Sequence, residues 1–217
     1  MPEVPFFYIF DLDDTLYSEI DFLISGYKHI IKNTSGLKST TGLFDDMLKR
    51  YHQGQDVFEW LVNILSEKNQ RAVKEDFIKQ YREHLPDIHL KKDAERFLSR
   101  IKNKKIPAGL ITDGRSITQR NKLKALGLTG FFRDVIISEE FGSEKPDARN
   151  FMFFAEKYPD YNFRFIGDNT QKDFVVPKQL GWEIFCIKDS GLNIHPQNFK
   201  GFDSFEIVSS FNEILLP

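Results

Sequence analysis

The sequence has little cysteine, little net charge and no long apolar segment, and each of these excludes a class of protein. The single cysteine, Cys186, cannot form an internal disulfide, so we expect a reducing, cytoplasmic compartment. A formal net charge of -2 provides no general attraction to nucleic acid or to an anionic membrane surface. No apolar segment approaches the roughly 20 residues of a transmembrane helix, and the start, MPEVPFFYIFDLDD, lacks the basic region of a signal peptide. We therefore expect a soluble protein without nucleic-acid or membrane partners.

The apolar residues, which make up 41% of the 217 residues, follow two different periods along the chain. Phe6–Phe10 is a continuous apolar run, typical of a strand that is buried on both faces. From about residue 18 to residue 90, apolar side chains recur at helical spacing, and no segment favours a strand. Beyond this block, strands and helices alternate. The predicted strands cover residues 106–112, 134–138, 163–167 and 182–187, and a last strand and helix are expected within residues 205–216.

This alternation indicates an α/β fold whose core is a doubly wound, parallel, Rossmann-like sheet. The helical block interrupts the core after its first strand, so we expect it to fold as an inserted cap domain. The predicted domains are a core of residues 1–16 and 91–217 and a helical cap of residues 17–90.

Polar residues follow four of the predicted strands, at the edge where an open parallel sheet binds its ligands. They are Asp11 and Asp13 after the first strand, Thr112, Asp113 and Gly114 after the second, Lys145 after the third, and Asp168 and Asp173 after the fourth. Aspartate and glycine are common in loops, but their presence at all four strand ends is difficult to attribute to chance. We expect these residues to form one site.

The residue types at this edge suit phosphoryl transfer. Oxygen ligands without cysteine or histidine favour a hard cation such as Mg²⁺. Asp11 and Asp13 lie two residues apart in extended backbone, so they face the same side. One carboxylate can attack phosphorus while the other handles the leaving-group proton. The groups expected to hold the phosphoryl oxygens and balance their charge are Thr112, the backbone N–H groups of Asp113 and Gly114, and Lys145.

The motifs FDLDDTLY, ITDG, EKPD and GDNTQKD occur in this order within residues 10–173, with the helical insert after the first. Together they resemble the haloacid dehalogenase-like (HAD) hydrolases, and within that family they are most similar to the capped, Mg²⁺-dependent phosphatases. DxDxT after a strand is the most specific of these motifs. The resemblance implies a phosphomonoester hydrolase that acts on a small phosphorylated metabolite, such as a nucleotide or a sugar phosphate, through an aspartyl-phosphate intermediate.

The resemblance also implies roles for individual residues. Asp11 matches the nucleophile, and Asp13 matches the general acid/base. Thr112 and Lys145 match the side chains that bind the phosphate. An insertion between the first and second motifs resembles the helical caps that close over small substrates.

The implied Mg²⁺ ligands are the Asp11 carboxylate, the main-chain carbonyl of Asp13, and Asp168. Asp173 matches an acid that orients the active-site lysine or a metal-bound water. One position departs from the family, because asparagine is common where this chain has Asp113. The additional carboxylate is expected to disfavour strongly anionic leaving groups.

Three other functions agree with parts of this pattern. A phosphomutase would form the same aspartyl-phosphate and pass it to a sugar hydroxyl. A metal-free dehalogenase of the same family would not need Asp13. A phospho-accepting receiver module, which is not an enzyme, lacks a long helical insert after its first strand and accepts the phosphate on a later strand.

Other polar residues near the motifs are expected to be structural. Asp14 alternates to the side opposite Asp13 and favours a turn or a helix start. Thr15 is expected to brace the loop through its hydroxyl, next to the nucleophile. The five histidines show no ligand spacing.

Overall fold

The computed structural model describes residues 4–38, 41–200 and 205–217, and the chain divides into two compact units. The first unit contains Met1–Ile20 and His89–Pro217, and the second contains Asp21–Ile88. The sequence placed the corresponding boundaries after residues 16 and 90. The role of the second unit as a cap stays a prediction.

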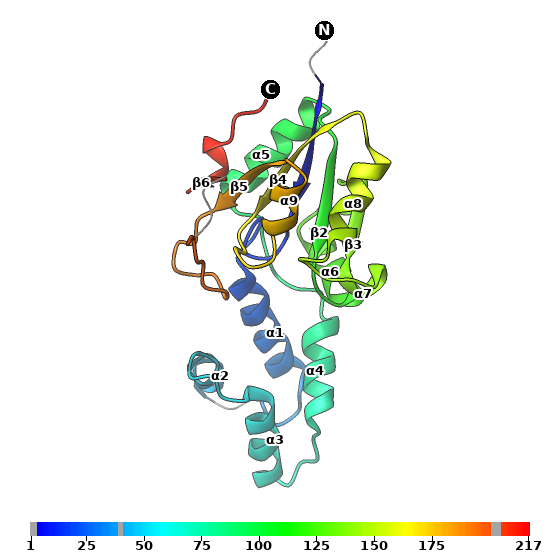
Figure 1. Ribbon diagram of the computed structural model, residues 1–217. Helices are drawn as coiled ribbons and strands as arrows, with labels where there is room; N and C mark the ends of the chain where they lie inside the picture. Colours follow the sequence, from blue (N-terminus) through cyan, green and yellow to red (C-terminus); the bar gives the residue numbers. More distant parts are fainter. Residues whose placement is uncertain (1–3, 39–40, 201–204) are drawn as a thin grey trace. The chain divides into compact units, whose positions relative to one another are not determined.

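A six-stranded sheet forms the centre of the first unit, and its strands run parallel in the order β3-β2-β1-β4-β5-β6 (Figure 1). The strands are β1 (Phe6–Phe10), β2 (Ala108–Thr112), β3 (Asp134–Ile137), β4 (Asn162–Gly167), β5 (Glu183–Ile187) and β6 (Glu206–Val208). This is the strand order of a doubly wound Rossmann-like sheet. The predicted fold class is therefore confirmed, and each predicted strand is present.

Helices connect these strands. They are α5 (Lys92–Asn103), α6 (Ser116–Ala125), α7 (Ser138–Phe141), α8 (Ala148–Lys157) and α9 (Val175–Gln179). The prediction of a final helix after β6 is wrong, because the chain forms only the short 3₁₀ helix η1 (Phe211–Glu213) there. This single turn already buries Phe211 and Ile214, whereas Leu215 is exposed, so a longer helix would bury no further apolar face.

The second unit contains helices and loops among its described residues, as predicted. Its helices are α1 (Glu19–Asn33), which begins in the first unit, α2 (Leu43–His52), α3 (Val57–Glu67) and α4 (Lys74–Glu83). Its interior is aromatic, and the rings of Phe22 and Tyr81 lie 5.1 Å apart between centroids. Gly26 makes this packing possible, because a Cβ at that position would lie 2.4 Å from the Tyr81 ring.

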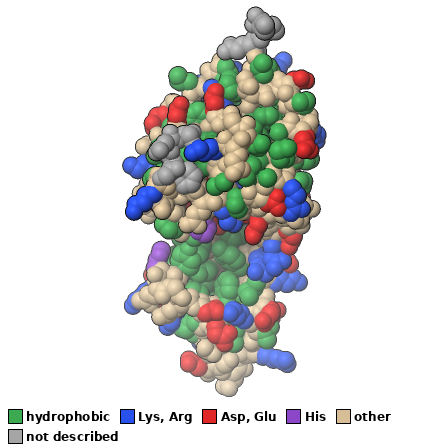
Figure 2. Space-filling view, in the orientation of Figure 1, with side chains coloured by type: hydrophobic (Ala, Val, Ile, Leu, Met, Phe, Trp, Pro, Cys, Tyr) green, Lys and Arg blue, Asp and Glu red, His purple; other side chains and the backbone are tan. Residues whose placement is uncertain are grey.

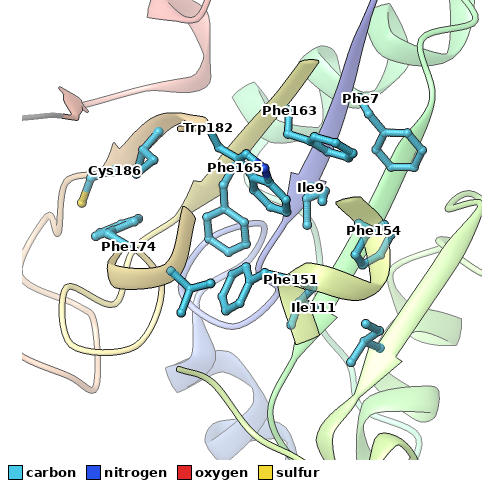
Figure 3. Packing of buried hydrophobic residues seen from close by; sticks show 13 residues of the cluster. Phe7, Ile9, Ile111, Phe151, Phe154, Phe163, Phe165, Phe174, Trp182 and Cys186 are labelled. Atoms are coloured by element: carbon cyan, nitrogen blue, oxygen red, sulfur yellow. The ribbon is translucent and has the colours of Figure 1, made fainter. Parts of the chain in front are cut away.

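A cluster of aromatic and aliphatic side chains covers one face of the sheet. Phe7 and Ile9 of β1 project into this cluster, together with Phe154 of α8 and Phe165 of β4 (Figure 3). Trp182 stacks on Phe163 with 4.6 Å between ring centroids. The abundant phenylalanine of the sequence is therefore largely core packing in this unit.

The alternate residues of β1 point to the opposite face. There, Tyr8 and Phe10 contact Phe97 of α5, and Phe10 also stacks on Phe211 of η1. Both faces of β1 are thus covered, which explains its uninterrupted apolar sequence.

Surface charge is mixed on the face of the molecule shown in Figure 2, where acidic and basic side chains are interspersed. Among the described residues, no helix combines the length and the apolar character that crossing a bilayer requires.

The strand order determines where the polar motifs meet. β1 lies next to β4, although β2 and β3 separate them in sequence, and the chain continues outward on opposite sides of this pair. Such a point of reversal leaves a crevice at the carboxyl ends of the two strands. Asp11 follows β1 and Asp168 follows β4, so both acids lie at this crevice.

We predict that Phe165→Ala will lower the free energy of unfolding by about 3–5 kcal/mol, the usual cost of truncating a buried phenylalanine. Phe165 is fully buried, and its ring lies 5.5 Å from that of Phe151. Urea denaturation followed by tryptophan fluorescence measures the change. Phe141→Ala, at a position that is 36% exposed, is the control and should cost much less. Equal losses in the two variants would contradict the assigned core.

Candidate active site

A small polar pocket of about 100 Å³ lies at the carboxyl ends of the strands. Its lining includes five residues predicted from the sequence, namely Asp11, Asp13, Asp113, Lys145 and Asp168. Three further predicted residues, Thr112, Gly114 and Asp173, are not part of the lining. Four separate loops therefore contribute to one site, as their positions after the strands indicated.

The first loop continues from β1 with alternating side chains. The backbone N–H of Asp11 donates to the carbonyl of Ile166 at 2.9 Å, which extends the pairing of β1 with β4 into the site. Leu12 is fully buried, while Asp11 and Asp13 both reach the pocket. The predicted common orientation of the two acids is thus confirmed.

Lys145 connects the first and last motifs. Its Nζ donates to Asp11 Oδ1 at 2.5 Å and to Asp173 Oδ1 at 2.7 Å. The side chain is only 4% exposed, and burial by itself would lower its pKa. Asp11 and Asp173 outweigh burial and raise the pKa of Lys145 above its ordinary value. Lys145 is therefore a fixed positive charge next to the predicted nucleophile.

Asp173 is fully buried, and both of its carboxylate oxygens are occupied. Oδ1 accepts the Lys145 bond, while Oδ2 accepts the backbone N–H groups of Asp168 and Asn169 at 3.2 and 2.9 Å. Gly167 permits this arrangement, because a Cβ there would lie 2.4 Å from Asp173 Oδ2. These contacts agree with the expected role of Asp173 in orienting the lysine.

Carboxylates outnumber the cations at the centre of the site. Asp11, Asp168 and Asp173 place one oxygen each within 4.8 Å of one another, and all three side chains are buried. Burial, together with the neighbouring carboxylates, raises the pKa of Asp168 to about 9. The pKa of Asp11 is raised by burial to about 7, although Lys145 opposes the shift. A cation bound between Asp11 and Asp168 would remove this excess of negative charge.

Two further side chains contact the carboxylate of Asp168. Asn193 Nδ2 donates to its Oδ2 at 2.7 Å, and the hydroxyl of Thr15 lies 3.3 Å from its Oδ1. The same hydroxyl lies 3.0 Å from Asp11 Oδ2. Thr15 therefore lies beside Asp11, the predicted nucleophile, and the loop that contains Asn193 takes part in the site.

Asp13 has a different set of partners from Asp11. Its Oδ1 accepts hydrogen bonds from Lys122 Nζ at 2.6 Å and from the Tyr17 hydroxyl, and its Oδ2 accepts one from Gln119 Nε2 at 2.8 Å. Burial alone would raise the pKa of Asp13, but the charge of Lys122 and these hydrogen bonds lower it. Asp11 and Asp13 are thus each paired with a different lysine.

Gly114 of the motif after β2 has a contact that the sequence did not indicate. Its backbone N–H donates to Ser138 Oγ at 2.9 Å, and its contact with a phosphoryl oxygen stays a prediction. Gly114 also provides space, because a Cβ at this position would lie 3.1 Å from the Gln119 amide carbon. Its φ of +141° also favours glycine.

The carboxylate of Asp113 is compensated by its surroundings. Its Oδ1 accepts the backbone N–H of Lys145 at 2.9 Å, and its Oδ2 lies 3.0 Å from Lys172 Nζ. The expectation that Asp113 repels anionic leaving groups is therefore weakened, because Lys172 also lines the pocket. Asp113 fixes the loop that presents Lys145.

Asp14 has the structural role that the sequence favoured. Its Oδ1 accepts the backbone N–H of Glu19, the first residue of α1, at 2.8 Å. Its Oδ2 accepts the backbone N–H of Ile194 at the same distance, 2.8 Å. Asp14 therefore connects the start of α1 to the loop that contains Asn193.

Several contributors to the site were not predicted. They are Tyr17, Gln119, Lys122, Lys172, Asn193 and the pocket-lining His195. For Gln119 and Lys122, the sequence offered one sign. The two residues follow the second motif and are three residues apart, so they share one face of a helix. Asn193 and His195 lie in a loop, where no periodic pattern of the sequence indicates which residues face the site.

The family of the chain follows from a match over most of its length. A family model described as haloacid dehalogenase-like hydrolase matches residues 8–187. The chain belongs to this family, and the resemblance that its motifs indicated is confirmed. It is accordingly an enzyme of the hydrolase class.

Several known proteins are similar to this chain over most of its length. A glyceraldehyde 3-phosphate phosphatase from Methanocaldococcus jannaschii is 27% identical over 183 residues, which are 80% of each chain. A protein of the same name from Methanopyrus kandleri is 25% identical over 92% of this chain and 91% of that one. Among solved structures, the HAD-hydrolase YfnB from Bacillus subtilis, bound to magnesium, has a TM-score of 0.65 at 20% identity over 97% of each chain. This structural similarity supports the fold.

We predict that Gly167→Ala will reduce turnover by about 10²-fold, the loss that a displacement of about 1 Å can cause at a catalytic group. The added Cβ must displace the Asp173 carboxylate and, with it, Lys145. The measurement is steady-state turnover together with the melting temperature. Gly142→Asn is the control, since that glycine has a φ of +76°, which asparagine tolerates, and no atom within 4 Å of its Cβ position. Full activity in Gly167→Ala would show that Asp173 is not needed in this position.

Proposed function

We propose that this protein is a Mg²⁺-dependent phosphatase that hydrolyses a phosphomonoester of a small metabolite through an aspartyl-phosphate intermediate. The observation that carries the proposal is the Asp11 carboxylate, which is buried at the end of β1, 2.5 Å from the Lys145 ammonium. A carboxylate beside a fixed cation in a small pocket is suited to attack a phosphoryl group whose oxygens the cation attracts.

In the first half of the reaction, an oxygen of Asp11 attacks phosphorus, and the bond from phosphorus to the leaving oxygen breaks. Asp13 in its acid form gives a proton to that oxygen, so the leaving group departs as an alcohol. Lys145, Thr112 and the backbone N–H of Asp113 stabilise the charge on the other phosphoryl oxygens.

In the second half, Asp13 acts as a base. It takes a proton from water, and the water oxygen attacks the phosphorus of the aspartyl-phosphate. The bond between phosphorus and the Asp11 oxygen breaks, which restores the carboxylate and releases inorganic phosphate. The hydrogen bonds from Gln119 and Lys122 lower the pKa of Asp13 and so favour its ionised form, which this step requires.

The acids of the site fit Mg²⁺. Asp11 and Asp168 are buried beside each other with raised pKa values, whereas the carboxylate of Asp173 is occupied by Lys145 and two backbone N–H groups. We therefore assign Asp11, Asp168 and the main-chain carbonyl of Asp13 as ligands. Asp173 is assigned as a supporting residue that contacts Lys145 and does not bind the ion. When bound, Mg²⁺ supplies positive charge to the phosphoryl oxygens.

The relatives support phosphatase chemistry rather than dehalogenation. Those from Methanocaldococcus jannaschii and Methanopyrus kandleri have phosphatase names, and a Thermus thermophilus protein named phosphoserine phosphatase is 34% identical over 48% of this chain. Dehalogenation does not need a second acid, whereas this chain surrounds Asp13 with three hydrogen-bond donors. These contacts hold the Asp13 carboxylate at the pocket, where it can exchange a proton with a leaving group or with water.

The substrate is proposed to be a small phosphorylated metabolite, such as a sugar phosphate or a nucleotide. The pocket of about 100 Å³ is smaller than the roughly 300 Å³ at which ligand pockets begin, so it suits the reacting group alone. We propose that residues of the helical unit recognise the remainder, and that the protein is cytoplasmic. A screen of phosphorylated metabolites with Mg²⁺ present, including glyceraldehyde 3-phosphate and phosphoserine, tests the proposal. Absence of turnover on every phosphomonoester, including aryl phosphates, would contradict it.

We predict that Asp11→Asn will remove the covalent intermediate and essentially all turnover, because Asp11 supplies the attacking oxygen. Trapping of phosphoenzyme with labelled substrate measures the intermediate. Normal formation of phosphoenzyme in this variant would show that the nucleophile is another residue.

We predict a different loss in Asp13→Asn, which keeps the main-chain carbonyl but removes the acid and base. Turnover of an alkyl phosphate should fall by roughly 10²–10⁴-fold, the usual span for a lost general acid/base. The first step should be less affected with p-nitrophenyl phosphate, whose leaving group needs little protonation. Rates of p-nitrophenol release and of phosphate release, measured separately, test this difference.

We predict that Mg²⁺ is required for turnover and that Zn²⁺ does not replace it, because the proposed ligands are all oxygen atoms. Mg²⁺ should raise the melting temperature of the unmodified protein, since a ligand that binds the folded state stabilises it. Asp168→Asn should lose both this shift and turnover. Full activity after exhaustive chelation would contradict a metal-dependent mechanism.

A further inference from the structure

Helix α6 presents two adjacent polar side chains to the first motif. Gln119 and Lys122 are three residues apart, so they lie on one face of the helix. Lys122 Nζ lies 2.6 Å from Asp13 Oδ1, and Gln119 Nε2 lies 2.8 Å from Asp13 Oδ2. Each oxygen of the Asp13 carboxylate is thus held by a different residue of the same helix.

Gln119 also connects Asp13 to the second motif. Its Nε2 donates to Thr112 Oγ1 at 2.5 Å as well as to Asp13 Oδ2. The Asp13 carboxylate can only accept, which fixes the orientation of the Gln119 amide. Because Thr112 uses its oxygen as the acceptor here, its hydroxyl hydrogen remains available to another group.

Gln119 and Lys122 are buried, and burying polar side chains costs free energy of folding. The side chain of Lys122 is 5% exposed, and Gln119 is 1% exposed. A buried lysine and a buried amide are rarely found without partners, and an apolar side chain of similar size would cost the helix less. Gly114 is part of the same arrangement, because its missing Cβ leaves space for the Gln119 amide.

We propose that Gln119 and Lys122 are positioning residues that fix the Asp13 carboxylate relative to Thr112, and so couple leaving-group protonation to phosphate binding. The inference rests on the proposed phosphatase function and adds two residues to it. Tyr17 completes the arrangement, since its hydroxyl donates to Asp13 Oδ1. The helix that follows the second motif therefore acts on the general acid/base of the first.

Lys122→Met is the first test, because methionine is an unbranched side chain only one atom shorter than lysine and carries no charge. Lys124→Met is the matched control, at an exposed position of the same helix. Both variants are assayed with glycerol phosphate and with p-nitrophenyl phosphate, alone and combined with Asp13→Asn. Melting temperatures are measured in parallel, and Gln119→Met provides a second variant if Lys122→Met does not fold.

We expect Lys122→Met to lower kcat on glycerol phosphate by about 10- to 10²-fold, within the range for a displaced catalytic group, with KM changed by less than about twofold. The first step on p-nitrophenyl phosphate should proceed, so that phosphoenzyme forms and then accumulates, because its hydrolysis also depends on Asp13. In the Asp13→Asn background, Lys122→Met should cause no further loss, since the two residues then act as one unit.

Two results would overturn the inference. One is activity equal to that of Lys124→Met on both substrates. The other is a loss of the same size on both substrates that persists in the Asp13→Asn background, which would indicate general damage to the fold. Failure of the proposed function is distinguishable, because it would appear as retained turnover in Asp11→Asn or as no leaving-group dependence in Asp13→Asn itself.

Discussion

The ion pairs of Lys145 with Asp11 and Asp173 are the interaction on which the rest of the site depends. Buried carboxylates repel one another and lose hydration, and a single ammonium group, 2.5 and 2.7 Å from two of them, offsets part of that cost. Lys145 comes from the loop after β3, so its pairing also fixes that loop against β1 and β4. Removing the lysine would leave two buried charges without a partner, which is more costly than losing the pair as a whole.

The sheet makes this pairing possible because β1 and β4 are neighbours despite about 150 intervening residues. The helical unit is inserted between β1 and β2, and the chain leaves the first unit after Ile20 and returns to it at His89. Such an insertion point allows the elements that contact a leaving group to vary while the phosphoryl chemistry stays constant.

Most of the fold could be predicted because parallel strands covered on both faces have long apolar runs, and Phe6–Phe10 is one. The acids could be predicted because they directly follow such runs. Lys122 and Gln119 could not, since a polar residue within a helix looks like a solvated face until the packing of α6 is known. The contact of the Gly114 N–H with Ser138 shows the same limit, because Ser138 begins α7, 24 residues further along the chain.

The two acids of the first motif have opposite environments. Asp11 is held by one lysine among other carboxylates, and its pKa is raised, so the site favours binding of a cation there. Asp13 has three donors on its two oxygens, and its pKa is lowered, so its ionised form is favoured. Surroundings that separate the pKa values of two neighbouring acids allow the two to take different roles. In this chain burial and the neighbouring acids raise the pKa of Asp11 against the opposing charge of Lys145, whereas the charge of Lys122 from α6 lowers the pKa of Asp13.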